Sequence, residues 1–217
     1  DKKGITTYYQ SSFSTLNSDV IKLRDWLLEH NCRHACMEST GKYWIPIWNI
    51  LENHINLTLA HPKYTKAIKG KKTDKKDSKW IADLFKHDLI PASFIPPKEI
   101  RQLRDLSRYR FKLTYAKVSE KNRIQNCFTM SNIRIDSIVS DPFGKSARLI
   151  VKDILSNPYF KPEDSLSLLH GSLIKKKDLI IESLQDIHVD FDQHLKMDIA
   201  YTHIDIIDSY IKKIESS

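Results

Sequence analysis

The sequence predicts a mixed α/β fold in which a small sheet domain is followed by an all-helical extension. The first 60 residues alternate between strand and helix periodicity, whereas residues 98–130 follow a helical period only. The chain has 217 residues, of which 41% are apolar and 29% are charged, which is the composition of folded domains and not of a disordered chain. We therefore expect two parts, residues 1–97 and residues 98–217.

The first part is expected to alternate strands and helices. The expected elements are a strand or hairpin over residues 1–16, a helix capped by Asn17 or Ser18, a buried strand at residues 35–37 that ends at Glu38, a helix from Thr40-Gly41 to Leu51, and a strand over residues 55–60. A loop or short turn over residues 61–73, a helix from Thr73 through Leu84 and a linker at residues 91–97 complete this part. The order β, α, β, α, β is typical of an α/β sheet.

The second part shows no strand signal. One long basic helix is expected over residues 98–130, and a helix should restart after Ser140-Asp141-Pro142. Residues 179–214 are expected to be helical, with Ile199, His203, Ile206, Tyr210 and Ile214 near heptad spacing. Such a stripe indicates a partner helix, and we expect a homo-oligomer formed through the C-terminal helices.

The positive charge is concentrated in the middle of the chain. Residues 61–123 carry 18 basic and 7 acidic side chains, a net +11, whereas residues 1–60 are balanced and residues 124–217 carry a net −3. Such a field attracts polyanions by releasing the counterions of their phosphates. A basic face exposed to solvent is the alternative interpretation, but aromatic residues among the cations favour nucleic acid. The candidate nucleic-acid-binding residues are Lys63, Lys66, Lys69, Lys71, Lys72, Lys75, Lys76, Lys79, Arg101, Arg104, Arg108, Arg110 and Arg123.

Several other classes find little support in the sequence. The longest apolar stretches fall short of the ~20 residues that a membrane helix needs, and there is no leader-like start, so we expect a cytoplasmic protein. Cys32, His34 and Cys36 alternate but provide only three soft ligands, and we expect structural cysteines there and no zinc site.

Three carboxylates form the candidate site. Glu38 ends a predicted strand, and Asp74 and Asp77 stand three residues apart in the first turn of a predicted helix, on one face and among lysines. Acids in a first helical turn also compensate the helix dipole, which is the structural alternative for this pair. Hard oxygen ligands among phosphate-binding cations are, however, typical of metal-assisted phosphodiester chemistry with Mg²⁺ or Mn²⁺.

Several short motifs together resemble a known family. They are Met37-Glu38-Ser39-Thr40-Gly41, Tyr43-Trp44, His61-Pro62, Lys72-Thr73-Asp74-Lys75-Lys76-Asp77 with Ala82, and Arg101, Leu103, Arg108 and Asn122-Arg123-Ile124. They are similar to the N-terminal half of the DEDD-type insertion-sequence transposases of the IS110 family, which includes the Piv-type DNA invertases. The resemblance is strong over residues 1 to about 135.

This resemblance implies a fold and a function. The fold is a RuvC-like, ribonuclease-H-type domain with four metal-binding acids, here incomplete, followed by a coiled-coil-like dimerisation segment. By position, Glu38 matches the second acid, Asp74 the third and Asp77 the fourth, whereas the first acid and the serine-bearing C-terminal domain have no match in this sequence. Because the chain begins with Asp1 in a turn, we expect a piece of a longer protein.

The expected function is transposition and recombination of DNA by metal-dependent phosphoryl transfer, with Glu38, Asp74 and Asp77 as catalytic metal ligands. DNA is the expected partner, and some members of the family also bind a structured guide RNA. The alternative is a catalytically inactive nucleic-acid-binding or interaction protein derived from a truncated transposase.

Overall fold

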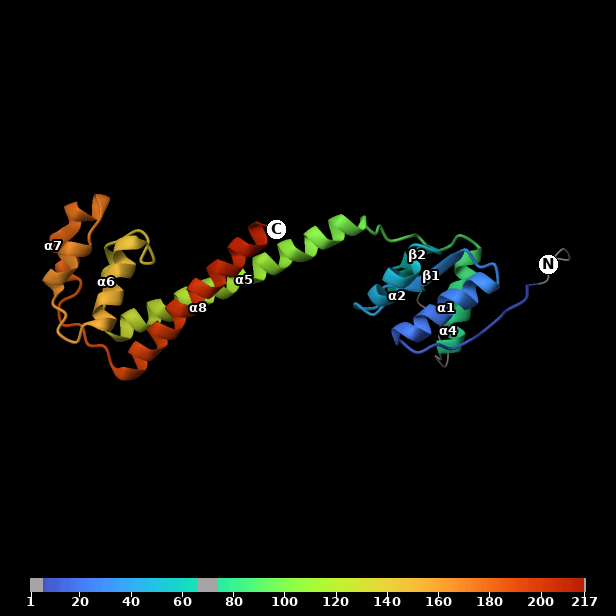
Figure 1. The fold of residues 1–217 in the computed structure, drawn as a ribbon, viewed down its shortest axis with the longest axis horizontal. Helices are drawn as coiled ribbons and strands as arrows, with labels where there is room; N and C mark the ends of the chain where they lie inside the picture. Colours follow the sequence, from blue (N-terminus) through green and yellow to red (C-terminus); the bar gives the residue numbers. More distant parts are fainter. Residues whose placement is uncertain (1–5, 66–73, 217) are drawn as a thin grey trace. The chain divides into compact units, whose positions relative to one another are not determined.

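The computed structural model describes residues 6–65 and 74–216, except for the side chains of Asp74 and Lys75. The chain divides into two compact units, residues 1–97 and residues 98–217 (Figure 1). The first unit combines helices with a small parallel sheet, and the described part of the second is helical. This agrees with the predicted mixed α/β fold with a helical extension.

The first unit is built around a β-α-β crossover. Its elements are α1 (Asn17–Glu29), β1 (His34–Glu38), α2 (Trp44–Leu51), β2 (Asn56–Ala60), α3 (Pro62–Thr65) and α4 (Asp74–Lys86). The two strands are parallel, with His34 opposite Asn56 and Glu38 opposite Ala60. Parallel neighbours need a crossover between them, and α2 provides it, with Trp48 and Leu51 buried. The helices and the two strands therefore lie close to their predicted positions.

The segment before α1 differs from its prediction. Residues 6–14 form neither a strand nor a hairpin. Their aromatic side chains instead contact helices: the ring centres of Tyr9 and His30 lie 4.9 Å apart, and those of Phe13 and Trp26 lie 5.8 Å apart. The alternation of apolar and polar residues thus reflects rings packed on α1 and not a strand in a sheet.

The start of α1 also differs from its prediction. The residue before the helix, Leu16, has extended backbone and its side chain makes no capping hydrogen bond, so neither Asn17 nor Ser18 is the cap. The Ser14 hydroxyl donates to the Asp19 carboxylate at 2.6 Å, and the amide of Asp19 donates to the Leu16 carbonyl. The end of α1 follows the sequence, because Asn31 adopts a positive φ of 53°, which asparagine tolerates better than most residues.

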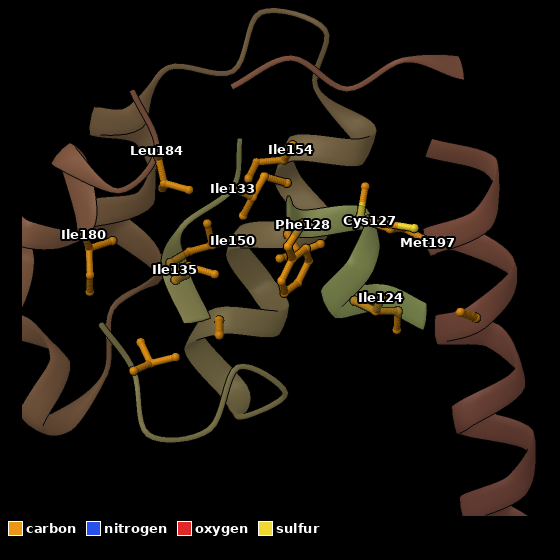
Figure 2. Packing of buried hydrophobic residues seen from close by; sticks show 14 of the residues in the cluster. Ile124, Cys127, Phe128, Ile133, Ile135, Ile150, Ile154, Ile180, Leu184 and Met197 are labelled. Carbon is orange, nitrogen blue, oxygen red and sulfur yellow. The ribbon is translucent and has the colours of Figure 1, made fainter. Parts of the chain in front are cut away.

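The second unit consists of two long helices and a cluster of short ones. Its elements are α5 (Lys98–Met130), the 3₁₀ turn η1 (Ile135–Ser137), α6 (Lys145–Ser156), the 3₁₀ helices η2 (Pro162–Leu168) and η3 (Gly171–Lys176), α7 (Lys177–Glu182) and α8 (Phe191–Glu215). Helix α8 lies along the second half of α5 (Figure 1). Figure 2 shows the core where the end of α5 meets α6, α7 and α8, with Phe128, Ile135 and Ile150 fully buried.

The C-terminal region differs from the single helix predicted over residues 179–214. Helix α7 ends at Glu182, and α8 begins at Phe191. Between them Leu184 is fully buried in the core, and Asp186 has a positive φ of 54°, which ends helical propagation. No helix in the described ranges is long and apolar enough to cross a membrane.

Candidate functional site

Glu38 lies at the end of β1, and two threonine hydroxyls hold its carboxylate. The hydroxyl of Thr40 donates to Oε1 at 2.6 Å, and that of Thr65 donates to Oε2 at 2.7 Å. Thr65 itself is only 4% exposed. Carboxylates gain orientation from such donors, so Glu38 is fixed at the end of β1 by the last residue of α3 and by Thr40.

Helix α4 carries the other two acids of the candidate site. It contacts both β1 and α3, the elements that hold Glu38 and Thr65. Asp74 is its first residue, and Asp77, which is partly buried, follows three positions later on the same side of the helix. The side chain of Asp74 lies outside the described part, so the convergence of the three carboxylates stays a prediction.

No three His, Cys, Asp or Glu side chains come together as metal ligands within the part of the chain whose side chains are described. The Cys32, His34 and Cys36 motif does not assemble, since the Cys32 thiol donates to the backbone carbonyl of His34 and the His34 side chain is exposed. Burial raises the pKa of the Cys36 thiol to about 11, so it stays protonated near neutral pH. Cys32 and Cys36 are partly buried, so the structural role expected for these cysteines stays a prediction.

The basic residues before and within α4 are described only in part. Lys66, Lys69, Lys71 and Lys72 and the side chain of Lys75 lie outside the described residues. Lys63, Lys76 and Lys79 are exposed.

The N-terminal segment contacts α4 beside these lysines. The Lys79 ammonium lies 4.2 Å from the centre of the Tyr8 ring. The Tyr8 hydroxyl donates to Asp83 at 2.7 Å, and this hydrogen bond raises the pKa of the tyrosine. Residues 6–8 are therefore fastened to α4 by polar contacts, which the sequence pattern did not indicate.

The first half of α5 presents cations and large apolar side chains to solvent. Arg104 and Arg108 are exposed, and Leu103, Tyr109, Phe111 and Tyr115 are between 54% and 61% exposed. The rings of Phe111 and Tyr115 meet edge to face, with their centres 4.6 Å apart. Arg101 is partly buried. Exposed rings among arginines provide stacking surfaces and phosphate contacts together.

Two of the predicted nucleic-acid-binding arginines also form ion pairs in the helical unit. Arg110 binds Glu215 at 2.6 Å and thereby joins α5 to the end of α8. Arg123 binds the buried Glu120 at 2.5 Å, and His203 on α8 approaches the same oxygen at 2.7 Å. Arg110 and Arg123 therefore already have a carboxylate partner each.

Glu120 is a structural residue that sequence reasoning missed. Burial by itself raises the pKa of this carboxyl, but the hydrogen bonds and charges of Arg123 and His203 outweigh burial and leave its pKa below the ordinary value. Its one indication in the sequence is that Glu120 occupies a position in α5 where the helical repeat would place an apolar residue. Thr40 and Thr65 were also missed, because hydroxyl partners of an acid have no characteristic spacing.

The protein thus combines two features. A carboxylate at the end of a parallel strand lies beside an acid-bearing helix, and a basic helical unit follows. Comparison with protein families specifies this further. The family model of the DEDD transposases of the IS110 type matches residues 1–132. The chain belongs to this transposase family, which confirms the resemblance found in the sequence. No curated protein matches the chain in the comparison made.

Proposed function

We propose that this transposase acts in the recombination of an insertion sequence with DNA by metal-dependent phosphoryl transfer. In this proposal Glu38, Asp74 and Asp77 hold Mg²⁺ or Mn²⁺ in a RuvC-like unit. The observation that carries it is the carboxylate of Glu38, oriented by Thr40 and Thr65 at the end of β1, against which α4 packs. A metal ion bound by such acids stabilises developing negative charge on a phosphoryl oxygen.

The donor set fits a hard divalent cation. The candidate ligands are all carboxylate oxygens, which Mg²⁺ prefers to nitrogen or sulfur. Both oxygens of Glu38 accept hydroxyl hydrogens, which orients the carboxylate for a metal ion.

Metal binding tests this proposal directly. Mn²⁺ binding is followed by electron paramagnetic resonance for the wild type and for Glu38→Gln and Asp77→Asn, which remove one charge each. Both variants should lose most of the binding. Asp83→Asn is the matched control, because Asp83 lies on α4 but bonds Tyr8, and it should bind like the wild type. Equal Mn²⁺ binding by all four proteins would refute the metal assignment and leave a nucleic-acid-binding protein without a metal site.

Nucleic-acid binding is the second component of the proposal, supported by the family and by the exposed cations of α5. Affinity for duplex DNA should fall with salt by about 0.9 logarithmic units per neutralised phosphate for each tenfold rise in salt. Replacing Arg104 and Arg108 with Gln should therefore reduce that slope by about 1.8. Replacing Lys175 and Lys177, exposed lysines of the same unit, is the control and should leave the slope unchanged. A structured RNA in place of the duplex tests the guide-RNA partner in the same assay.

We also propose a homo-oligomer formed through the exposed apolar side chains of α5 and α8. Ile199, Ile206 and Tyr210 are 58%, 43% and 51% exposed on α8, and Leu103 is 61% exposed on α5. Large apolar side chains at heptad-like spacing on a long helix are typical of a surface that another helix covers. Sedimentation equilibrium of the whole chain measures this association.

A further inference from the structure

A cleft between α6 and α8 in the second unit is not explained by the proposed acid site. It has a volume of about 570 Å³, within the range of small-ligand sites. One wall is a face of α6 that carries Lys145, Arg148 and Lys152, which are spaced by three and four residues and so lie on one side of the helix. Lys145 and Lys152 are exposed and form no ion pair with any residue that the structure describes. This wall therefore offers two cations to an anionic ligand.

The floor of the cleft is apolar and aromatic. Leu149 and Leu155 of α6 and Tyr201 of α8 line it, and all three are partly buried. The Arg148 guanidinium carbon lies 5.3 Å from the centre of the Tyr201 ring, while its terminal nitrogen binds Asp205 at 2.5 Å. The guanidinium is thus fixed against one ring, an arrangement that supports stacking of a flat group beside it.

Tyr201 also has an unused polar group. Its hydroxyl is buried and has no hydrogen-bond partner among the described residues. Burial raises the pKa of this hydroxyl, so it is a neutral donor near neutral pH. A buried polar group without a partner is unfavourable, and a ligand that opens the cleft far enough to reach this hydroxyl would satisfy it. The nearby His194 is already engaged, since its Nε2–H donates to the Leu155 carbonyl at 2.7 Å.

We propose that this cleft holds one unpaired nucleotide of a nucleic-acid strand, with its base against Leu149, Leu155 and Tyr201 and its phosphate between Lys145 and Lys152. The inference rests on the proposed nucleic-acid binding and gives it a second contact surface. A base is flat, largely apolar on its faces and polar at its edge, and its phosphate is anionic, so a nucleotide complements both the floor and the basic wall. Asp198 on the opposite wall can accept a hydrogen bond from a base amino group.

A chain of contacts links Tyr201 in the cleft to α5, which favours a strand over a free nucleotide. The Lys121 ammonium of α5 lies 4.7 Å from the centre of the Phe143 ring, and this ring lies 6.5 Å from that of Tyr201. Helix α8 runs from the cleft to Arg110 of α5, and the ten residues from Asp205 to Glu215 span about 15 Å. A single strand bound along α5 can therefore reach the cleft.

Photocrosslinking of the whole chain tests the proposal. An oligothymidine with 5-bromouracil in place of one thymine is bound and irradiated, and the crosslinked peptide is identified by mass spectrometry. We expect crosslinks at Tyr201 or His194. Lys145→Gln with Lys152→Gln should weaken binding of the oligonucleotide about tenfold and reduce its salt slope by about 1.4. Lys175→Gln with Lys177→Gln is the matched control and should change neither.

The outcomes separate this inference from the proposed function. Crosslinks confined to Tyr109 or Tyr115, with unchanged affinity in the Lys145 and Lys152 variant, would overturn the cleft site while leaving the binding by α5 intact. Binding of thymidine monophosphate that is lost in the Lys145 and Lys152 variant, together with no crosslink of the oligonucleotide in the cleft, would overturn the assignment to a strand. Absence of salt-dependent binding to any oligonucleotide would reject the proposed nucleic-acid binding and the cleft site together.

Discussion

Two isoleucines of α8 should respond very differently to the same substitution. Ile204 and Ile206 are two residues apart, so they point about 200° apart around the helix. Ile204 is 3% exposed and faces α5 of its own chain, whereas Ile206 is 43% exposed. Replacing each with Ala removes the same atoms from two different environments.

The expected magnitudes follow from burial. At about 0.8 kcal/mol per buried carbon, the three carbons lost from Ile204 amount to ~2.4 kcal/mol, and the remaining cavity extends the range for such substitutions to about 2–5 kcal/mol. Ile206→Ala should change the free energy of unfolding of the monomer by no more than about 0.5 kcal/mol. If α8 pairs with a second copy through Ile206, this variant should instead weaken association.

Urea unfolding followed by far-ultraviolet circular dichroism, at several protein concentrations, measures both quantities. Ile204→Ala should lower the midpoint of the helical unit at every concentration, and Ile206→Ala should lower it only where the wild type is associated. If the two variants lowered the urea midpoint equally at the lowest protein concentration, both faces of α8 would be buried within one chain. The described packing of α8 on α5 would then be wrong.

Three further outcomes are expected. Ile206→Glu together with Tyr210→Glu should convert an oligomer to a monomer in sedimentation equilibrium, because a charge in an apolar seam is costly, and a wild type that is monomeric at high concentration would contradict the proposed surface. The stabilisation by the lowered pKa of Glu120 should be present above its ordinary value of 4.5 and be lost as pH falls through the lower folded value, and Glu120→Gln should abolish this loss in acid unfolding curves. Thr65→Val should weaken Mn²⁺ binding about 10–100-fold by releasing Glu38, and unchanged binding would show that the hydroxyl does not position it.

The helices were the most predictable part of this fold. The period of apolar residues placed α2, α4 and α5 within a few residues of their observed bounds, although the apolar side chains in the first half of α5 are exposed and not buried. The strands β1 and β2 were recognisable as short apolar runs on either side of a helix.

The segment over residues 6–14 shows why periodicity alone was insufficient. Alternating rings fit a strand, but a strand also needs a neighbour to pair its backbone, and no local pattern reveals whether one exists. Here the rings of Tyr9 and Phe13 contact α1 instead, and Tyr8 bonds α4. The decisive contact with α4 spans 75 residues, a separation that a window of residues cannot detect.

In helix α8, too, the sequence pattern did not reveal which side contacts the rest of the chain. Its sequence contains two stripes of mostly apolar residues. In the predicted stripe Ile199, Ile206 and Tyr210 are exposed, whereas Ile214 is partly buried and His203 binds Glu120 of α5. The buried stripe runs through Met197, Ala200, Ile204 and Ile207, with the small Ala200 allowing close approach of another helix. A helix with apolar residues on two sides has two possible partners, and only the fold shows which side its own chain occupies.

The two stripes together explain how one helix can serve stability and association independently. The face of α8 toward α5 is fixed by apolar burial, by the ion pair of Lys117 with Asp208 and by the hydrogen bond between Glu120 and His203. Because this internal face needs no contribution from Ile206 or Tyr210, those side chains can be exposed without loss of the helical unit. Their exposure carries a solvation cost, which a second copy of the chain would remove. It follows that α8 should remain folded in a monomeric variant, and that association should change without a change in helix content.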